Sequence, residues 1–170
     1  ESAYNPISQF AVFVPDARIG RVTPAGDGND LFLVGMTMWP LSLMAAVYLG
    51  IADRALEIAA GSARRKKSVA IERGAYAYNP FVQHQTAEMY LELDAASATF
   101  ERFVNDWAAG VDHGEAWVPK VYSMKWRAVE AAKRVVDVGL DVVGGAGMFR
   151  GNELERLYRD VRCGGFHPAN

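Results

Sequence analysis

Two long stretches of the sequence repeat apolar residues every three or four positions, and this period admits few folds. The apolar positions of the first stretch are Met89, Leu93, Ala96, Phe100, Phe103 and Trp107, opposite Gln85, Glu88, Glu92, Thr99, Arg102 and Asp106. Those of the second are Val121, Met124, Ala128, Ala131, Val135, Gly139 and Val142. Residues at this spacing share one face of an α-helix, so each stretch is predicted to be an amphipathic helix with a buried apolar face.

Start and stop signals bound the two helices. Asn79 is suited to cap a helix whose first residue is Pro80, and Gly110 is suited to end it. The second helix is predicted from about Glu115 to Val143, where a cluster of glycines breaks the pattern.

Two further helices are predicted on either side of this pair. One runs from about Pro40 to Lys67, because proline suits the first turn of a helix better than its middle. The other runs from Glu153 to Arg162, with Arg156 and Asp160 spaced for a surface ion pair. Three long helices and one short helix predict an all-α fold, an antiparallel up-and-down bundle.

The residues before the bundle have a different character. Residues 9–14 are apolar and favour a β-strand, and a linker rich in glycine follows over residues 21–30. We therefore divide the chain into residues 1–30, a residual strand of a preceding β domain with its linker, and residues 31–170, the helical bundle. The chain reads as a piece of a longer protein.

An uncharged run over residues 31–52 raises the question of a membrane span. Gly35, Pro40 and Gly50 interrupt the run, and Asp53 and Arg54 follow it at once, which favours the buried helix of a soluble protein. A formal net charge of -2 gives no field that would attract nucleic acid or an anionic membrane. The single cysteine, Cys163, excludes an internal disulfide and is compatible with a cytoplasmic location.

Five segments resemble the acyl-CoA dehydrogenase superfamily. RVVDVGLDVVGGAGMFR (134–150) and ERLYRDVR (155–162) are similar to the family's last long helix, its glycine turn and the short helix that follows. LGIADRAL (49–56) and VQHQTAEM (82–89) look like its first two carboxy-terminal helices, and VFVPDARI (12–19) is similar to the last strand of its middle β domain. The resemblance is collinear and spans most of the chain.

This resemblance implies a larger flavoenzyme that binds FAD and assembles as a homodimer or homotetramer. The amino-terminal domain and most of the middle domain would be missing here. In such flavoproteins the isoalloxazine lies between the β domain and the bundle, and a neighbouring subunit's bundle reaches the pyrophosphate. The fragment alone is therefore expected to lack a complete site.

The glycine turn is the first candidate cofactor contact. Without Cβ atoms, Gly144 and Gly145 let backbone N–H groups approach a phosphate, although a glycine helix stop explains the same pattern. Asp141 stands where the family has an amide side chain, and a carboxylate there would repel a pyrophosphate unless a cation intervenes.

A basic cluster at the end of the first helix is the second candidate. The resemblance implies that a basic residue there reaches the partner's flavin phosphates, and we select Arg65 and Lys66. A cluster of cations at a helix carboxy terminus is explained equally well by the helix dipole.

The family's catalytic glutamate has no counterpart. Members supply it from one of two places, and Pro40 and Pro168 fall at these positions. Neither can remove a proton. His167 adjoins the second position and lies seven residues after Asp160, a spacing at which flavin-dependent monooxygenases of this fold carry a histidine acid or base. A chain-end histidine without a role is the alternative.

The sequence thus predicts an FAD-dependent oxidoreductase acting on the Cα–Cβ bond of an acyl-CoA thioester. A monooxygenase of the same fold that acts on another small molecule through His167 is the first alternative. A non-catalytic helical oligomerisation module is the second. No metal site is predicted.

Overall fold

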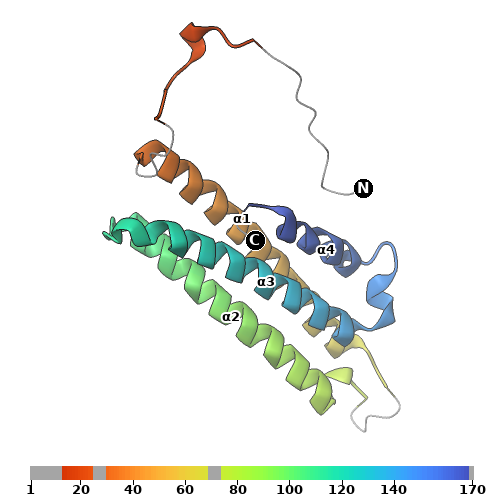
Figure 1. Cartoon of the computed structure of the whole chain (residues 1–170). Coiled ribbons are helices and arrows are strands. Elements are labelled where there is room, and N and C mark those ends of the chain that lie inside the picture. Colours follow the sequence, from red (N-terminus) through yellow and green to blue (C-terminus); the bar gives the residue numbers. More distant parts are fainter. Residues whose placement is uncertain (1–12, 25–29, 69–73, 169–170) are drawn as a thin grey trace.

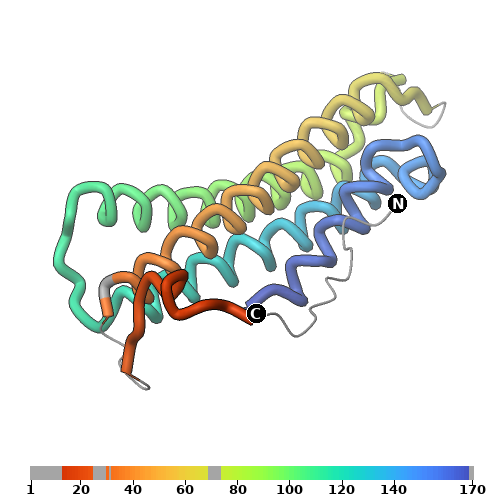
Figure 2. The backbone as a smooth tube through the Cα atoms, turned by 90° about the horizontal axis from the view of Figure 1, so that it is seen from above, coloured from red at the N-terminus to blue at the C-terminus, as the bar shows by residue number. Residues whose placement is uncertain are grey.

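The computed structural model describes residues 13–24, 30–68 and 74–168. Three long helices, α1 (Leu31–Arg65), α2 (Pro80–Ala108) and α3 (Trp117–Val143), run antiparallel in an up-and-down bundle, and α4 (Glu153–Arg162) packs on α3 and α1 (Figures 1 and 2). Short 3₁₀ turns complete the described part of the chain: η1 (Asp16–Arg18), η2 (Tyr76–Tyr78), η3 (Gly114–Ala116), η4 (Gly145–Met148) and η5 (Cys163–Phe166). The all-α prediction is confirmed.

Helix α3 lies at the centre of the bundle, in contact with the other three helices. All seven residues of its predicted apolar stripe are buried. Met89, Leu93, Ala96 and Phe103 of α2 are buried as well, and Phe100 and Trp107 pack against this core from its edge. The apolar surface that α2 and α3 bury against each other is removed from water, and this burial stabilises the fold.

The prediction that the first helix begins at Pro40 is wrong, because α1 begins at Leu31. The Asp30 side chain caps it, accepting hydrogen bonds from the N–H groups of Phe32 at 2.9 Å and Leu33 at 3.2 Å. Pro40 therefore lies inside the helix. Pro40 is on the exposed side, where water can bond the carbonyl that a proline leaves without a donor.

The other boundaries agree closely with the signals in the sequence. The Asn79 side chain accepts from the N–H of Phe81 at 2.9 Å, Pro80 is the first residue of α2, and Gly110 follows that helix with a φ of 64°. Helix α3 begins two residues after Glu115, which lies in η3. Helix α4 has the predicted bounds, and its Arg156 and Asp160 side chains approach to 3.5 Å.

Further predictions from the sequence have different outcomes in the structure. Gln85 was placed on the polar stripe, but its side chain is buried because it faces the end of α3. The predicted strand over residues 9–14 lies mostly outside the described residues, and Phe13 and Val14 have no strand structure. The division at residue 30 stays a prediction.

Helix α1 is long and apolar enough to cross a membrane by length and composition alone. The core helix of a soluble protein passes the same test, and α1 has such a core face. Ala45, Ala52, Ala55 and Ala59 are completely buried, and α1 packs closely along α3. We therefore keep the interpretation of α1 as a core helix.

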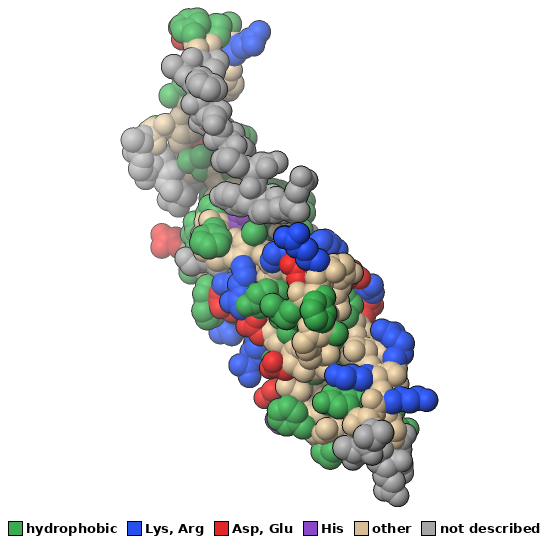
Figure 3. Space-filling view, turned by 90° about the vertical axis from the view of Figure 1, so that its right-hand side faces the viewer, with side chains coloured by type: hydrophobic (Ala, Val, Ile, Leu, Met, Phe, Trp, Pro, Cys, Tyr) green, Lys and Arg blue, Asp and Glu red, His purple; other side chains and the backbone are tan. Residues whose placement is uncertain are grey.

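Charged side chains of both signs alternate with apolar ones on the face of the molecule shown in Figure 3. This mixture agrees with the formal net charge of -2 for the whole sequence.

Candidate functional site

The glycine turn after α3 depends on the conformation of Gly144. Its φ of 74° and ψ of -169° are strained for residues with a Cβ, so glycine is required at this helix end. The Gly144 N–H donates to the carbonyl of Leu140 at 2.7 Å, so this amide closes the helix. Gly145 is exposed and begins η4, and the first N–H groups of a helical turn have no partner within that turn. Of the two predicted glycines, Gly145 is therefore better suited to offer an N–H to a ligand.

Lys66 lies directly beside this turn. A Cβ built on Gly144 would stand 3.4 Å from the Lys66 Nζ atom, although 78 positions separate the two residues in the sequence. The ammonium group also sits 4.6 Å from the centre of the Tyr76 ring, a cation–π contact that holds it in place. Lys66 and Gly144, two residues predicted from separate motifs, are thus brought together.

Arg65 takes a different direction. Its guanidinium folds back along α1, and a Cβ built on Gly61 would lie 3.2 Å from its Nη1 atom. The structure therefore places Lys66, and not Arg65, at the glycine turn.

A cavity of about 750 Å³ opens beside the turn, between the start of α2 and the end of α3. Asp141, Gly144 and Gly145 line it together, and the buried Gln85 adds an amide that the sequence interpretation had assigned to the polar surface. The other lining residues are Phe81, Asp137, Leu140, Met148 and Tyr158. Asp137 is neutralised by Arg162 at 2.7 Å, so Asp141 is the carboxylate of the cavity without an ion pair among the described residues.

His167 lies elsewhere, against α1. Its Nε2 atom is 3.0 Å from the hydroxyl oxygen of Tyr48, and the two rings meet at 60° with centroids 5.9 Å apart. Burial, together with the nearby Cys163 and Asp160, raises the pKa of Tyr48 to about 12, so the phenol stays protonated near neutral pH. Burial also lowers the pKa of His167, as does the charge of Lys125, so this imidazole is neutral near pH 7.

Lys125 was missed by the sequence interpretation. It is completely buried on α3, and its Nζ atom lies 3.4 Å from the carbonyl oxygen of Gly164. Burial lowers the pKa of this amine. A signal for it existed: Lys125 shares a helical face with Val121, Ala128 and Ala132, all of them buried.

The two groups of candidate residues are well separated. Val129, which packs under the turn that carries His167, precedes Gly144 by 15 residues on α3. At 1.5 Å per residue this places them about 22 Å apart along the helix. The chain therefore carries two distinct candidate sites, a glycine turn with Lys66 and a histidine held by Tyr48.

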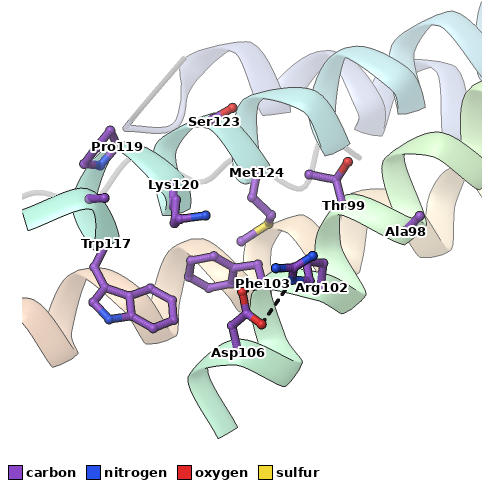
Figure 4. A pocket seen from close by; sticks show the side chains of 11 residues that line it. Ala98, Thr99, Arg102, Phe103, Asp106, Trp117, Pro119, Lys120, Ser123 and Met124 are labelled. Carbon is purple, nitrogen blue, oxygen red and sulfur yellow. Dashed lines mark hydrogen bonds and ion pairs between the residues drawn. The ribbon is translucent and has the colours of Figure 1, made fainter. Parts of the chain in front are cut away.

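A further cavity of about 590 Å³ lies between α2 and the start of α3 (Figure 4). Asp106 is bonded there by Arg102 at 3.1 Å and by His113 at 2.9 Å, and these two partners lower the pKa of its carboxyl. The Trp117 ring packs edge-on against Phe103 at 5.4 Å. These contacts join the end of α2 to the start of α3, and they make His113 a packing residue of this corner.

Both positions at which the resemblance led us to expect a glutamate hold proline. Pro40 lies on the exposed side of α1, and Pro168 follows His167 at the exposed end of the described chain. Among the described residues, no group of three His, Cys, Asp or Glu side chains could hold a metal ion.

The chain matches a known family over most of its length. A profile described as "Acyl-CoA dehydrogenase, C-terminal domain" matches residues 42–170, and the chain belongs to this family. Its members are FAD-dependent flavoproteins.

Three similar proteins illustrate the range of the fold. Amino sugar nitrososynthase DnmZ of Streptomyces peucetius is 31% identical over 155 residues, 88% of this chain and 38% of DnmZ. The structure of a probable acyl CoA dehydrogenase from Mycobacterium abscessus is 28% identical with a TM-score of 0.70, over 78% of this chain and 34% of that one. XiaF from Streptomyces sp., solved with FADH2 and glycerol, is 18% identical over 76% of this chain and 34% of XiaF; its TM-score of 0.67 shows the shared fold alone. This chain thus spans little more than a third of such proteins.

The glycine turn fits the phosphates of FAD. A turn without a Cβ at Gly144, an exposed Gly145 and the Lys66 ammonium form a cradle with one positive charge. Among the described residues that line the cavity, Asp141 is the carboxylate that opposes an anion, since Asp137 is paired with Arg162. Lys66, Gly144 and Gly145 are the residues of this chain that would hold the pyrophosphate.

Proposed function

We propose that this chain is the helical carboxy-terminal domain of an FAD-dependent enzyme that oxygenates a small molecule, with His167 as its acid or base. The observation that carries the proposal is the hydrogen bond between His167 and Tyr48, together with proline at both glutamate positions. Dehydrogenation of an acyl-CoA needs a carboxylate at the α carbon, and neither Pro40 nor Pro168 can supply one. The 31% identity to an amino sugar nitrososynthase also favours oxidation of a substrate other than an acyl-CoA.

Reduced FAD would supply two electrons to O₂, so that one oxygen atom enters the substrate and the other leaves as water. The residues of this chain would donate and accept the protons of this reaction. A neutral imidazole holds one N–H donor and one acceptor nitrogen, and the Tyr48 phenol decides which nitrogen faces the reacting groups. If the phenol donates to Nε2, then Nδ1 carries the proton that His167 presents to the site.

The glycine turn would serve a different flavin molecule from the one near His167. The two sites lie about 22 Å apart along α3. Such a separation is expected if Lys66, Gly144 and Gly145 bind the pyrophosphate held by a neighbouring subunit in a homodimer or homotetramer.

The missing amino-terminal and middle domains, or neighbouring subunits, would also cover α1. Its large apolar side chains at three- or four-residue spacing are more than half exposed: Phe32, Met36, Trp39, Leu43 and Val47. An exposed apolar stripe of this length on one helix face is unfavourable in water.

The full-length parent enzyme tests the reaction type. With the flavin reduced by a separate reductase, oxygenation predicts substrate-dependent oxygen uptake and a product that carries ¹⁸O from ¹⁸O₂. Dehydrogenation predicts instead that an acyl-CoA bleaches the oxidised flavin anaerobically, and that an added dye acceptor is reduced as it takes the two electrons from the flavin. This result would overturn the proposal.

His167→Ala in the same enzyme tests the assigned residue. Turnover should fall roughly 100-fold or more, the usual contribution of a positioned acid or base. His84→Ala is the matched control, because His84 is exposed on α2. Equal turnover for both variants would remove His167 from the reaction. A parent that binds no flavin would support a non-catalytic assembly module.

A further inference from the structure

We propose that Lys125 is a positioning residue for His167: its buried ammonium group anchors the turn η5 and so sets where the imidazole lies against Tyr48. The inference rests on the proposed function, because it takes His167 to be the acid or base. Lys125 reaches neither the glycine turn nor the exposed surface, and it acts through the chain that follows α4.

The first step of the argument is the contact between Lys125 and Gly164. The amine is completely buried and lies 3.4 Å from the Gly164 carbonyl oxygen. Taking a lysine out of water is unfavourable, and an apolar residue at the same place on α3 would extend the core. A buried ammonium at this position is therefore better explained by its contact with the Gly164 carbonyl than by a contribution to core stability.

The second step is the tight packing of Gly164. A Cβ built on this residue would stand 2.6 Å from Val129 Cγ1 and 3.0 Å from Tyr48 Cε1. The backbone of η5 is thus pressed between α1 and α3, and Lys125 binds its carbonyl from the α3 side. The turn has little room to move while this contact is present.

The third step links the turn to the histidine. His167 comes three residues after Gly164, and its ring bonds to the same Tyr48 whose ring packs on Gly164. Lys125, Gly164, Tyr48 and His167 therefore form one connected group drawn from α3, η5, α1 and the end of the chain. A shift of the turn would move the imidazole relative to Tyr48.

Several titratable and charged groups surround Lys125, Tyr48 and His167. Tyr48 faces this group from α1, Glu130 and Lys133 from α3, and Asp160 and Cys163 from α4 and η5. Burial lowers the pKa of His167, and the positive charge of Lys125 lowers it further. Removing that charge should raise the pKa of His167, so the acidic limb of a pH–rate profile should move to higher pH.

The test uses the full-length flavoenzyme with Lys125→Met, and with Lys125→Gln as a second uncharged variant if the first folds poorly. We expect kcat to fall roughly 10- to 100-fold, the effect of a misplaced catalytic group. The acidic limb of kcat/KM should move to higher pH, and FAD content should be unchanged. Lys120→Met, an exposed lysine on the same helix, should behave like the wild type.

A double-mutant cycle with His167→Ala separates positioning from a purely structural role. If Lys125 acts through His167, adding Lys125→Met to His167→Ala should lower turnover little further. Multiplicative losses, or an acidic limb that does not move, would overturn the proposal. If His167→Ala alone leaves turnover unchanged, the proposed function fails instead, which is a distinguishable result.

Discussion

The hydroxyl of Tyr48 lies 3.0 Å from Nε2 of His167, although 119 residues separate them in the sequence. This bond ties the first long helix to the last described residues of the chain. It fixes one nitrogen of the imidazole and leaves the other for chemistry. Because the pKa of Tyr48 is raised to about 12, the bond persists through the neutral pH range.

Replacing Tyr48 by phenylalanine should therefore impair the enzyme without unfolding it. The ring still packs on Gly164, and the lost hydrogen bond is worth about 1 kcal/mol. We expect lower turnover at unchanged FAD content, measured on the full-length enzyme. Tyr90→Phe is the control, because Tyr90 is exposed on α2. Equal activities of the two variants would show that the bond does not orient His167.

Replacing Gly164 by alanine should destabilise the fold. The added Cβ would stand 2.6 Å from Val129 Cγ1, and overpacking of this kind costs roughly 1–3 kcal/mol. Gly50→Ala offers a matched control, because its Cβ would meet no atom within 4 Å and alanine is favoured inside a helix. Urea unfolding of the full-length protein should give opposite signs for the two changes. A neutral Gly164→Ala would contradict the tight packing of η5.

Replacing Lys66 by methionine should weaken FAD binding by the parent enzyme. The change removes the cation beside Gly144 and its contact with Tyr76. We expect roughly threefold to tenfold weaker binding, the effect of about 1 kcal/mol from an exposed charge. Lys67→Met is the control at the next position, and equilibrium dialysis of FAD gives the measurement. Equal FAD affinities of the two variants would show that the flavin phosphates do not lie at the glycine turn beside Lys66.

Replacing Asp141 by asparagine should strengthen FAD binding by the parent enzyme. The carboxylate lines the cavity beside Gly144 and Gly145, and it repels a pyrophosphate. Its removal restores the amide that the family has at this position, and FAD affinity should rise by a similar factor. The salt dependence of binding should also change, since an unfavourable charge is lost. An unchanged or lower affinity would argue against a phosphate in this cavity.

Much of the bundle could be predicted from the sequence, because its helices carry their own signals. The buried stripe of α3 follows from periodicity, and the start of α2 from Asn79 and Pro80. The start of α1 could not be predicted from Pro40, since the cap at Asp30 and the exposure of the proline decide it. At that position the cap at Asp30 and the access of water to Pro40 outweigh the tendency of proline to break a helix.

The candidate sites were only partly predictable. Motifs identified Lys66, Gly144 and His167, but spacing along a chain does not show which side chains meet across a bundle. The contact of Lys66 with Gly144 and that of Tyr48 with His167 depend on helix packing. Lys125 was missed because lysine is rarely buried, so its position on the buried face of α3 was not considered.

The attachment of α4 to α1 should depend on pH through Arg54 and Glu153. Their side chains form two hydrogen bonds, at 3.0 and 2.8 Å, and the guanidinium holds the pKa of the Glu153 carboxyl below its ordinary value. A carboxyl with a depressed pKa stabilises the fold above its unfolded pKa, and this contribution is lost as the pH falls through the folded value. Glu153→Gln should therefore lower the Tm of the full-length protein at pH 7 and have a smaller effect near pH 3. Glu101→Gln on α2 is the control for an exposed carboxylate that has no ion pair among the described residues. A Tm difference for Glu153→Gln that stays constant between the two pH values would show that the ion pair does not stabilise the docking of α4.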